Sequence, residues 1–248
     1  MSAAPRLDAI DALRGAAMLW MTLFHFGFDL NHFGYWQQDF YRDPFWTTQR
    51  TCILSLFLFC AGLGQAVAVH QGQGGERFWR RWGQIAGSAA LVTAGSALMY
   101  PRSFIFFGVL HGMAVMLVLV RLTAHWGRWL WLAGALALAA PPLAASWLAQ
   151  SPWENTFNAG GLSWLGLITA KPITEDYVPV LPWLGVVWWG MAAGQALLRQ
   201  PPAWLTRPMH SGPLALLAAA GRWSLSYYLL HQPVLIGLLV AAGWLLRA

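Results

Sequence analysis

Charged residues are scarce in this chain of 248 residues: they make up 10% of it, where a soluble domain carries roughly 25%. This scarcity excludes a water-soluble globule, and an apolar content of 58% excludes an intrinsically disordered chain. Cysteine is almost absent, with only Cys52 and Cys60. On one helix they would lie about 12 Å apart, whereas a disulfide needs Cα atoms within roughly 7 Å, so neither a disulfide nor a thiol metal site is predicted.

The sequence also lacks the short motifs of several enzyme classes. No Cys/His spacing resembles a zinc site, and neither a P-loop nor a G-x-S-x-G nucleophile motif occurs. We therefore expect no metal cofactor. A net charge of +6 would suggest nucleic-acid binding in a soluble protein, but in an apolar chain excess Arg usually marks cytoplasmic loops, so no nucleic-acid partner is expected.

Long apolar runs dominate what is present. Because a membrane span needs about 20 mostly apolar residues, the runs predict an all-α, polytopic helix bundle in a lipid bilayer, organised as a single transmembrane domain over residues 1–248. The seven predicted spans are 10–30, 52–69, 85–99, 105–120, 130–148, 180–198 and 225–246. Two shorter stretches, 161–170 and 213–220, predict re-entrant or interfacial helices, unless one of them pairs with a neighbour to form an eighth span.

The distribution of basic residues predicts the orientation of these spans. With the N-terminus inside, ten of the 15 Arg and Lys residues lie on the cytoplasmic side: Arg6, Arg14, Arg77, Arg80, Arg81, Arg121, Arg128, Arg199, Arg207 and Arg222. An odd number of spans then places the C-terminus outside. The first span contains charged residues and is followed by no A-x-A cleavage site, which favours an uncleaved span over a signal peptide.

Ionisable residues inside a span cost about 3 kcal/mol each, so they are functional candidates. The first span holds Asp11, Arg14, His25 and Asp29. At about 100° per residue, Arg14 and His25 fall within about 20° of one another, Asp29 lies one turn beyond His25, and His32 continues the stripe. One helix face therefore carries a cation near its inner end and an acid–base pair near its outer end.

Two interpretations of this stripe are open. A carboxylate one turn from an imidazole can orient the ring, which makes His25 a candidate base, Asp29 its orienting partner and Arg14 a third catalytic candidate. Alternatively, Asp29 only pairs with Arg42, and His25 only hydrogen-bonds a neighbouring helix.

Further polar or aromatic residues lie within or beside apolar runs and are candidates for a substrate pocket: His32, His111, Asp176, Trp183, His231 and Gln232. Pro233 removes a backbone donor beside His231, so His231 and Gln232 could equally satisfy the broken helical turn. Asp176, before the prolines that precede a span, either lines a cleft near the external surface or is solvated.

Several blocks of the sequence resemble one known family. They are Arg6-Leu-Asp-Ala-Ile-Asp-Ala-Leu-Arg-Gly with the following His25 and Asp29, Ser55-Leu-Phe-Leu-Phe-Cys-Ala-Gly, Phe107-Gly-Val-Leu-His-Gly, Pro182-Trp-Leu-Gly, and Gly221-Arg-Trp-Ser-Leu-Ser-Tyr-Tyr-Leu-Leu-His-Gln-Pro. In this order they are similar to the bacterial heparan-alpha-glucosaminide N-acetyltransferase catalytic-domain-like family. The Arg14–His25 spacing and the last block are also similar to the wider membrane acyltransferase-3 group.

The resemblance implies an enzyme of the bacterial inner membrane that transfers an acyl group, typically acetyl from acetyl-CoA, to an acceptor. It implies a catalytic role for Arg14 and His25. In the lysosomal animal enzyme the catalytic histidine falls further along, and His32 is its nearest counterpart here. The acceptor does not carry over: a glycan, a lipid-linked sugar and a small amine all stay open, as does assembly into a homo-oligomer.

The residues permit a mechanism on this basis. Arg14 and Arg222, on the cytoplasmic side, would bind the phosphates of acyl-CoA, and His25 lies about 16 Å further along the helix axis. His25, oriented by Asp29, would deprotonate the acceptor or take the acyl group covalently. The rival interpretations are a proton- or ion-coupled carrier that uses the intramembrane His and Asp residues, and a membrane scaffold without chemistry.

Overall fold

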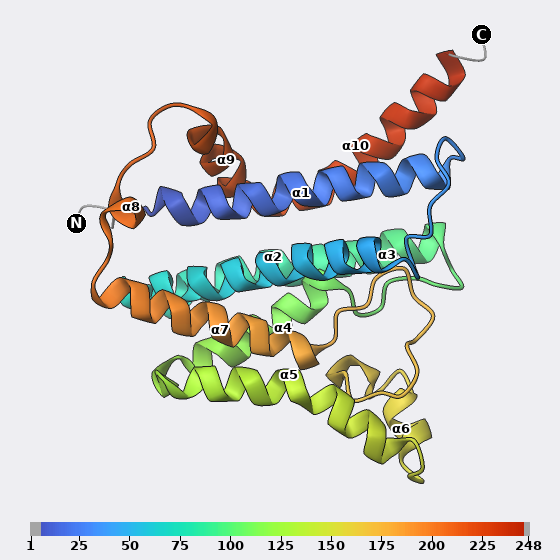
Figure 1. Ribbon diagram of the computed structural model, residues 1–248, viewed down its shortest axis with the longest axis horizontal. Helices are drawn as coiled ribbons and strands as arrows, with labels where there is room; N and C mark the ends of the chain where they lie inside the picture. Colours follow the sequence, from blue (N-terminus) through green and yellow to red (C-terminus); the bar gives the residue numbers. More distant parts are fainter. Residues whose placement is uncertain (1–5, 246–248) are drawn as a thin grey trace. The chain divides into compact units, whose positions relative to one another are not determined.

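The computed structural model describes residues 6–245, and its regular secondary structure is helical (Figure 1). Within these residues the only β-type pairing is an isolated parallel bridge between Phe107 and Tyr177. The predicted all-α fold is therefore confirmed. The chain separates into two compact units, one formed by residues up to Phe57 together with those from Pro201 onwards, the other by Leu58–Gln200.

The first unit is organised around α1 (Asp8–His32). It also contains the first part of α2 (Pro44–His70), α8 (Ala203–Thr206), α9 (Pro213–Arg222) and α10 (Ser224–Leu245). Helix α1 packs along α9 and also contacts α10 (Figure 1). The α1–α9 contact is backbone on backbone, because a Cβ atom on Gly221 would overlap the carbonyl oxygen of Asp11.

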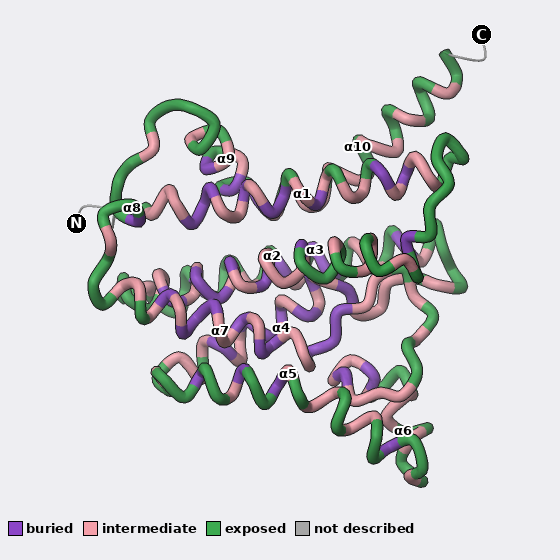
Figure 2. Tube along the Cα trace, viewed as in Figure 1, coloured by how far each residue is buried: buried purple, intermediate pink, exposed green. Residues whose placement is uncertain are grey.

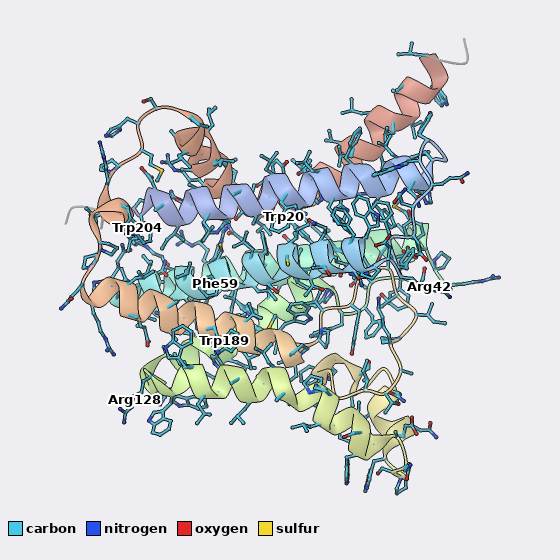
Figure 3. All side chains as sticks on the ribbon, viewed as in Figure 1. Trp20, Arg42, Phe59, Arg128, Trp189 and Trp204 are labelled. Atoms are coloured by element: carbon cyan, nitrogen blue, oxygen red, sulfur yellow. The ribbon has the colours of Figure 1, made fainter. Side chains whose placement is uncertain are left out.

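The second unit is built around α7 (Val180–Arg199), which packs against α5 (Trp129–Leu148) and α4 (Val109–Leu122). Helix α3 (Gly75–Met99) packs on α4, and α6 (Glu154–Asn158) is a short helix after α5. Close packing again depends on small residues, such as Gly185 of α7 against the carbonyl of Gly134 in α5. The indole nitrogen of Trp189 donates a hydrogen bond of 3.0 Å to the carbonyl of Trp131 (Figure 3).

Four helices are long and apolar enough to cross a membrane by length and composition: α2, α5, α7 and α10. The other predicted spans coincide with α1, α3 and α4, so each prediction falls on a helix, whereas the count of seven or eight spans stays a prediction. The last predicted span ends at residue 246, which lies outside the described residues. In α10, Ser224 is the only buried residue, so most of this strongly apolar helix is available for contact with lipid. Figure 2 shows the C-terminal part of the helix as intermediate and exposed.

Two predicted segments need correction. Helix α4 begins at Val109 and not at residue 105, because Gly108 is extended and Asp176 receives the N–H of Val109 at the new helix start. Its 14 residues cover about 21 Å, less than the roughly 30 Å of a bilayer core. The stretch 161–170 forms no α-helix, only the 3-10 turn Ser163–Leu165, whereas 213–220 is helical within α9.

Glycine geometry explains why the stretch 161–170 is not helical. Gly166 has φ +91°, in the left-handed region that ends a helix, and a Cβ atom there would overlap the carbonyl oxygen of Leu181. Apolar composition alone contains no signal for this local turn.

Candidate active site

Helix α1 is unbroken from Asp8 to His32, so its polar residues do lie along one helix. Near its start, Asp11 and Arg14 lie beside α9, where Arg222 approaches Asp11. Near its end, His25 and Asp29 contact α10. The polar stripe therefore faces other helices of the first unit.

The central feature of the site is a pair of histidines from α1 and α10. The rings of His25 and His231 are 5.1 Å apart between centroids and meet edge to face at 83°. His231 Nδ1 lies 2.8 Å from the carbonyl oxygen of Tyr228, and because a carbonyl only accepts, Nδ1 must be the donor. In the neutral ring the lone pair is then on Nε2, which is buried and has no hydrogen-bond partner within the described residues.

Asp29 contacts α10 through Gln232. The Gln232 side-chain amide donates a hydrogen bond of 2.7 Å to Asp29 Oδ1, and Asp29 is only 3% exposed. This corrects both sequence interpretations of Asp29, since its hydrogen bond is neither to His25 nor to Arg42. Arg42 extends from the loop after α1 away from the helices (Figure 3).

Two residues that the sequence analysis missed hold α1 and α10 together. The Tyr227 ring stacks on His231 at 6.0 Å with an interplanar angle of 5°. Its hydroxyl donates to Thr22 Oγ1 at 2.5 Å, because the Thr22 hydroxyl donates to the carbonyl of Met18. The spacing of four residues between Tyr227 and His231 was a usable signal for the stacking, whereas Thr22 has no distinctive spacing.

A cluster of ion pairs surrounds the start of α1. Asp11 is paired with Arg6 at 2.9 Å and with Arg14 at 2.8 Å, and Arg222 pairs with Asp8 at 2.8 Å. The backbone N–H of Met209 donates to Asp8 at 3.0 Å. This hydrogen bond, with the Arg222 guanidinium, lowers the pKa of Asp8 below its ordinary value of 3.8.

This cluster brings the two predicted phosphate-binding residues together. Arg14 and Arg222 both approach Asp11, at 2.8 Å and 4.0 Å. A cavity of about 670 Å³ adjoins Arg222 and is lined also by residues 209–213, Ala215 and Leu216. The three guanidinium groups outnumber the two carboxylates, so the cluster keeps a positive charge.

The remaining predicted pocket residues are not part of this site. His32 is the exposed last residue of α1, while His111, Asp176 and Trp183 belong to the second unit. His111 Nδ1 accepts from the backbone N–H of Gly108 at 3.3 Å, and Nε2 hydrogen-bonds Thr93 at 2.9 Å. His111 and Asp176 thus stabilise the start of α4, and Trp183 is partly buried in the first turn of α7.

Comparison with known families identifies the family of this chain. Residues 6–233 match the family described as heparan-alpha-glucosaminide N-acetyltransferase, catalytic. The chain belongs to this family. No curated protein and no solved structure matched the chain.

Membership of this N-acetyltransferase family makes the chain an acetyltransferase-type enzyme, and its four long apolar helices make it a membrane protein. The matched range includes all of α1 and extends through His231 and Gln232 of α10, so it contains the complete histidine pair. Among the described residues, no group of three His, Cys, Asp or Glu side chains is arranged to hold a metal ion.

Proposed function

We propose that this protein is a membrane-embedded acetyltransferase that moves an acetyl group from cytoplasmic acetyl-CoA to an amine or hydroxyl group of a sugar acceptor. One observation carries the proposal. Within the family-matched range, the His231 ring is fixed by the Tyr228 carbonyl, and its Nε2, which has no hydrogen-bond partner within residues 6–245, is buried next to His25. A fixed imidazole with an unoccupied nitrogen is suited to act as a general base.

The reaction proceeds by direct transfer. His231 Nε2 accepts the proton of the acceptor N–H or O–H as the acceptor atom attacks the thioester carbonyl carbon. A C–N or C–O bond forms, the C–S bond breaks, and the CoA thiolate takes the proton back from His231. His25, whose ring meets the His231 ring edge to face, lines the same reaction space and contributes its own imidazole to proton transfer.

The donor binds at the N-terminal end of α1. Arg6, Arg14 and Arg222 form ion pairs there, and we call these three residues the arginine cluster. Arg14 and Arg222 bind the phosphates of acetyl-CoA, because guanidinium groups form charge-assisted, bidentate hydrogen bonds with phosphate. His25 lies eleven residues beyond Arg14, about 16 Å along the helix axis, and the long, thin pantetheine arm spans that distance. We therefore propose that the start of α1 faces the cytoplasm and that the protein lies in the inner membrane of a bacterium.

The decisive experiment measures acetyl transfer from radiolabelled acetyl-CoA to glucosamine by the purified protein in proteoliposomes. His231→Ala and His25→Ala should each lower kcat about 100-fold to 10,000-fold, the usual contribution of a general base. His125→Ala is the matched control, since His125 lies in a 3-10 turn of the second unit and should retain activity.

Undiminished acetyl transfer by both His231→Ala and His25→Ala would contradict the proposal. So would pH-dependent ion flux through a protein that does not bind acetyl-CoA, because that combination indicates a carrier.

A further inference from the structure

One arginine of the second unit, Arg121 at the end of α4, is held in place by two neighbours. Its Nη2 donates a hydrogen bond of 2.5 Å to the carbonyl of Gln73, and its Cζ lies 5.6 Å from the centre of the Phe78 ring. Its Nη1 is buried and has no hydrogen-bond partner within the described residues, and Arg121 takes part in no ion pair among residues 6–245. Because arginine stays charged and a buried, unpaired charge is costly, this geometry favours an anion from outside the chain.

Arg121 belongs to the end of the second unit where basic residues gather. Its bond to Gln73 joins the end of α4 to the loop between α2 and α3, and Gln195 of α7 donates to the carbonyl of Ala124, just after α4, at 2.6 Å. Six arginines lie on these neighbouring segments, and we call them the basic end: Arg77, Arg80, Arg81, Arg121, Arg128 and Arg199. Glu76 is the one acid among them, whereas the connections at the other ends of these helices hold Arg102, Lys171, Glu154, Glu175 and Asp176.

Exposed tryptophans accompany the basic end: Trp79 in α3, Trp126 after α4 and Trp129 at the start of α5. Arg128 projects beyond the first turn of α5 (Figure 3). Three of the four helices long enough to cross a membrane begin or end here, namely α2, α5 and α7. Tryptophan prefers the membrane interface, and arginines beside membrane spans attract anionic lipids, so the phosphate of a phospholipid is the anion that fits this place.

The loop beside Arg121 leaves room for a lipid headgroup. A Cβ atom on Gly72 or Gly74 would lie more than 4 Å from every described atom beyond its chain neighbours. Glycine also has the widest backbone freedom, so this loop can shift at little cost. A phosphate can therefore reach Arg121 Nη1 from the side of Gln73.

We propose that Arg121 and the basic end bind the phosphate of an anionic phospholipid at the membrane surface. Arg121 Nη1 donates a charge-assisted hydrogen bond to a phosphate oxygen, and the exposed arginines around it attract the lipid by charge. The basic end lies in the second unit and the candidate active site in the first, so this inference goes beyond the proposed function. With the start of α1 in the cytoplasm, the basic end faces the cytoplasmic leaflet.

Native mass spectrometry of the purified full-length protein, titrated with lipid in detergent, tests the inference. Phosphatidylglycerol, which is anionic, should bind at least tenfold more tightly than phosphatidylcholine, whose net charge is zero. Arg121→Gln should raise the Kd for phosphatidylglycerol about 10-fold to 100-fold, the range of a lost hydrogen bond to a charged group. Arg102→Gln is the matched control, because it removes an exposed charge from the opposite end of the second unit and should leave this Kd unchanged.

A second variant tests the surface without disturbing the Arg121–Gln73 contact. Arg77 and Arg128 are both exposed, so the double variant Arg77→Gln/Arg128→Gln should keep the parent Tm and raise the Kd about fivefold for each charge removed.

Equal affinity of the parent for the two lipids, or an unchanged Kd for phosphatidylglycerol in both variants, overturns the inference. Glycerol phosphate that binds as tightly as phosphatidylglycerol would show that the ligand is a soluble anion, which also overturns it. So would an Arg121→Gln protein that binds phosphatidylglycerol normally and has a raised KM for acetyl-CoA, because the anion would then belong to the donor. None of these outcomes bears on His231 and His25, so failure of this inference is distinguishable from failure of the proposed function.

Discussion

At the scale of single residues, the chemistry of this molecule depends on which side-chain atoms already form hydrogen bonds. His111 and His231 are both partly buried histidines near the start or middle of a helix. Both ring nitrogens of His111 form hydrogen bonds, with Gly108 and Thr93, whereas in the described part of the chain His231 forms one through Nδ1 alone. The same residue type therefore stabilises a helix start in one place and is available for proton transfer in the other.

Arg222 supplies a prediction about the donor. If its guanidinium binds a phosphate of acetyl-CoA, Arg222→Gln should raise the KM for acetyl-CoA about 10-fold to 100-fold, the range of a lost charge-assisted hydrogen bond. The KM for S-acetyl-pantetheine, which has no phosphate, should change less than threefold. Arg80→Gln is the control, since Arg80 is exposed and its ion pair among residues 6–245 is with Glu76, one helical turn away. An equal rise for both donors contradicts phosphate binding by Arg222.

Asp8 supplies a prediction about pH and stability. Because the Met209 N–H and Arg222 lower its pKa in the folded protein, the ionised carboxylate stabilises the fold above its ordinary pKa of 3.8. That contribution is lost as the pH falls through the lowered, folded-state pKa. Asp8→Asn should therefore lower Tm at pH 7, and the difference from the parent should shrink at pH 3, as measured by thermal unfolding in detergent. A gap in Tm that is the same at both pH values would argue against this role.

At the scale of helices, the α1–α9 contact positions the arginine cluster. A Cβ atom on Gly221 would overlap the carbonyl of Asp11, and Gly15 faces the carbonyl of Leu217 in the same way. Two glycines thus allow the backbones to touch, and Arg222 follows directly after this contact. The close packing of α1 on α9 therefore positions Arg222 for its ion pairs with Asp8 and Asp11.

Gly221→Ala tests this contact. The added methyl group must push α9 from α1, which should destabilise the protein by about 1–3 kcal/mol, the usual cost of overpacking. It should also raise the KM for acetyl-CoA, because Arg222 would move away from Asp8. Gly237→Ala is the control, since a Cβ built there on α10 lies more than 4 Å from every described atom beyond its chain neighbours and the nearby backbone of its own helix. Equal thermal stability of the two variants, measured by Tm, would show that the α1–α9 contact tolerates the methyl group.

Among the helices and their contacts, only part of the fold and of the candidate site could be predicted from the sequence. The stripe on α1 was predictable because ionisable residues are rare in an apolar run and the helical period places them together. The partner of Asp29 was not, because Gln232 lies 203 positions away in the chain. The missing helix at 161–170 was also hidden, since the left-handed conformation of Gly166 depends on its contact with Leu181 in the tertiary structure.

At the scale of the whole molecule, the family match and the composition of the helices both indicate a membrane-bound enzyme of the acetyltransferase type. The match covers residues 6–233, and it includes all of the second compact unit and most of the first. Four helices have the length and hydropathy of membrane spans, and α1 has the length but carries the ionisable stripe. Charges that lower the hydropathy of α1 are the same groups that form the candidate site, so a hydropathy criterion undervalues this helix for a functional reason.

The orientation of the chain provides the last prediction. If the start of α1 is cytoplasmic, the loop between α1 and α2 faces outside and the loop between α2 and α3 faces inside. Arg42 is an exposed residue of the first loop, and Arg77 is an exposed residue in the first turn of α3, next to the second loop. In a background with Cys52 and Cys60 replaced by Ser, Arg42→Cys should react with a membrane-impermeant maleimide in intact cells, and Arg77→Cys should react only after permeabilisation. The reverse labelling pattern would place the arginine cluster on the side opposite to cytoplasmic acetyl-CoA and would contradict the proposed donor path.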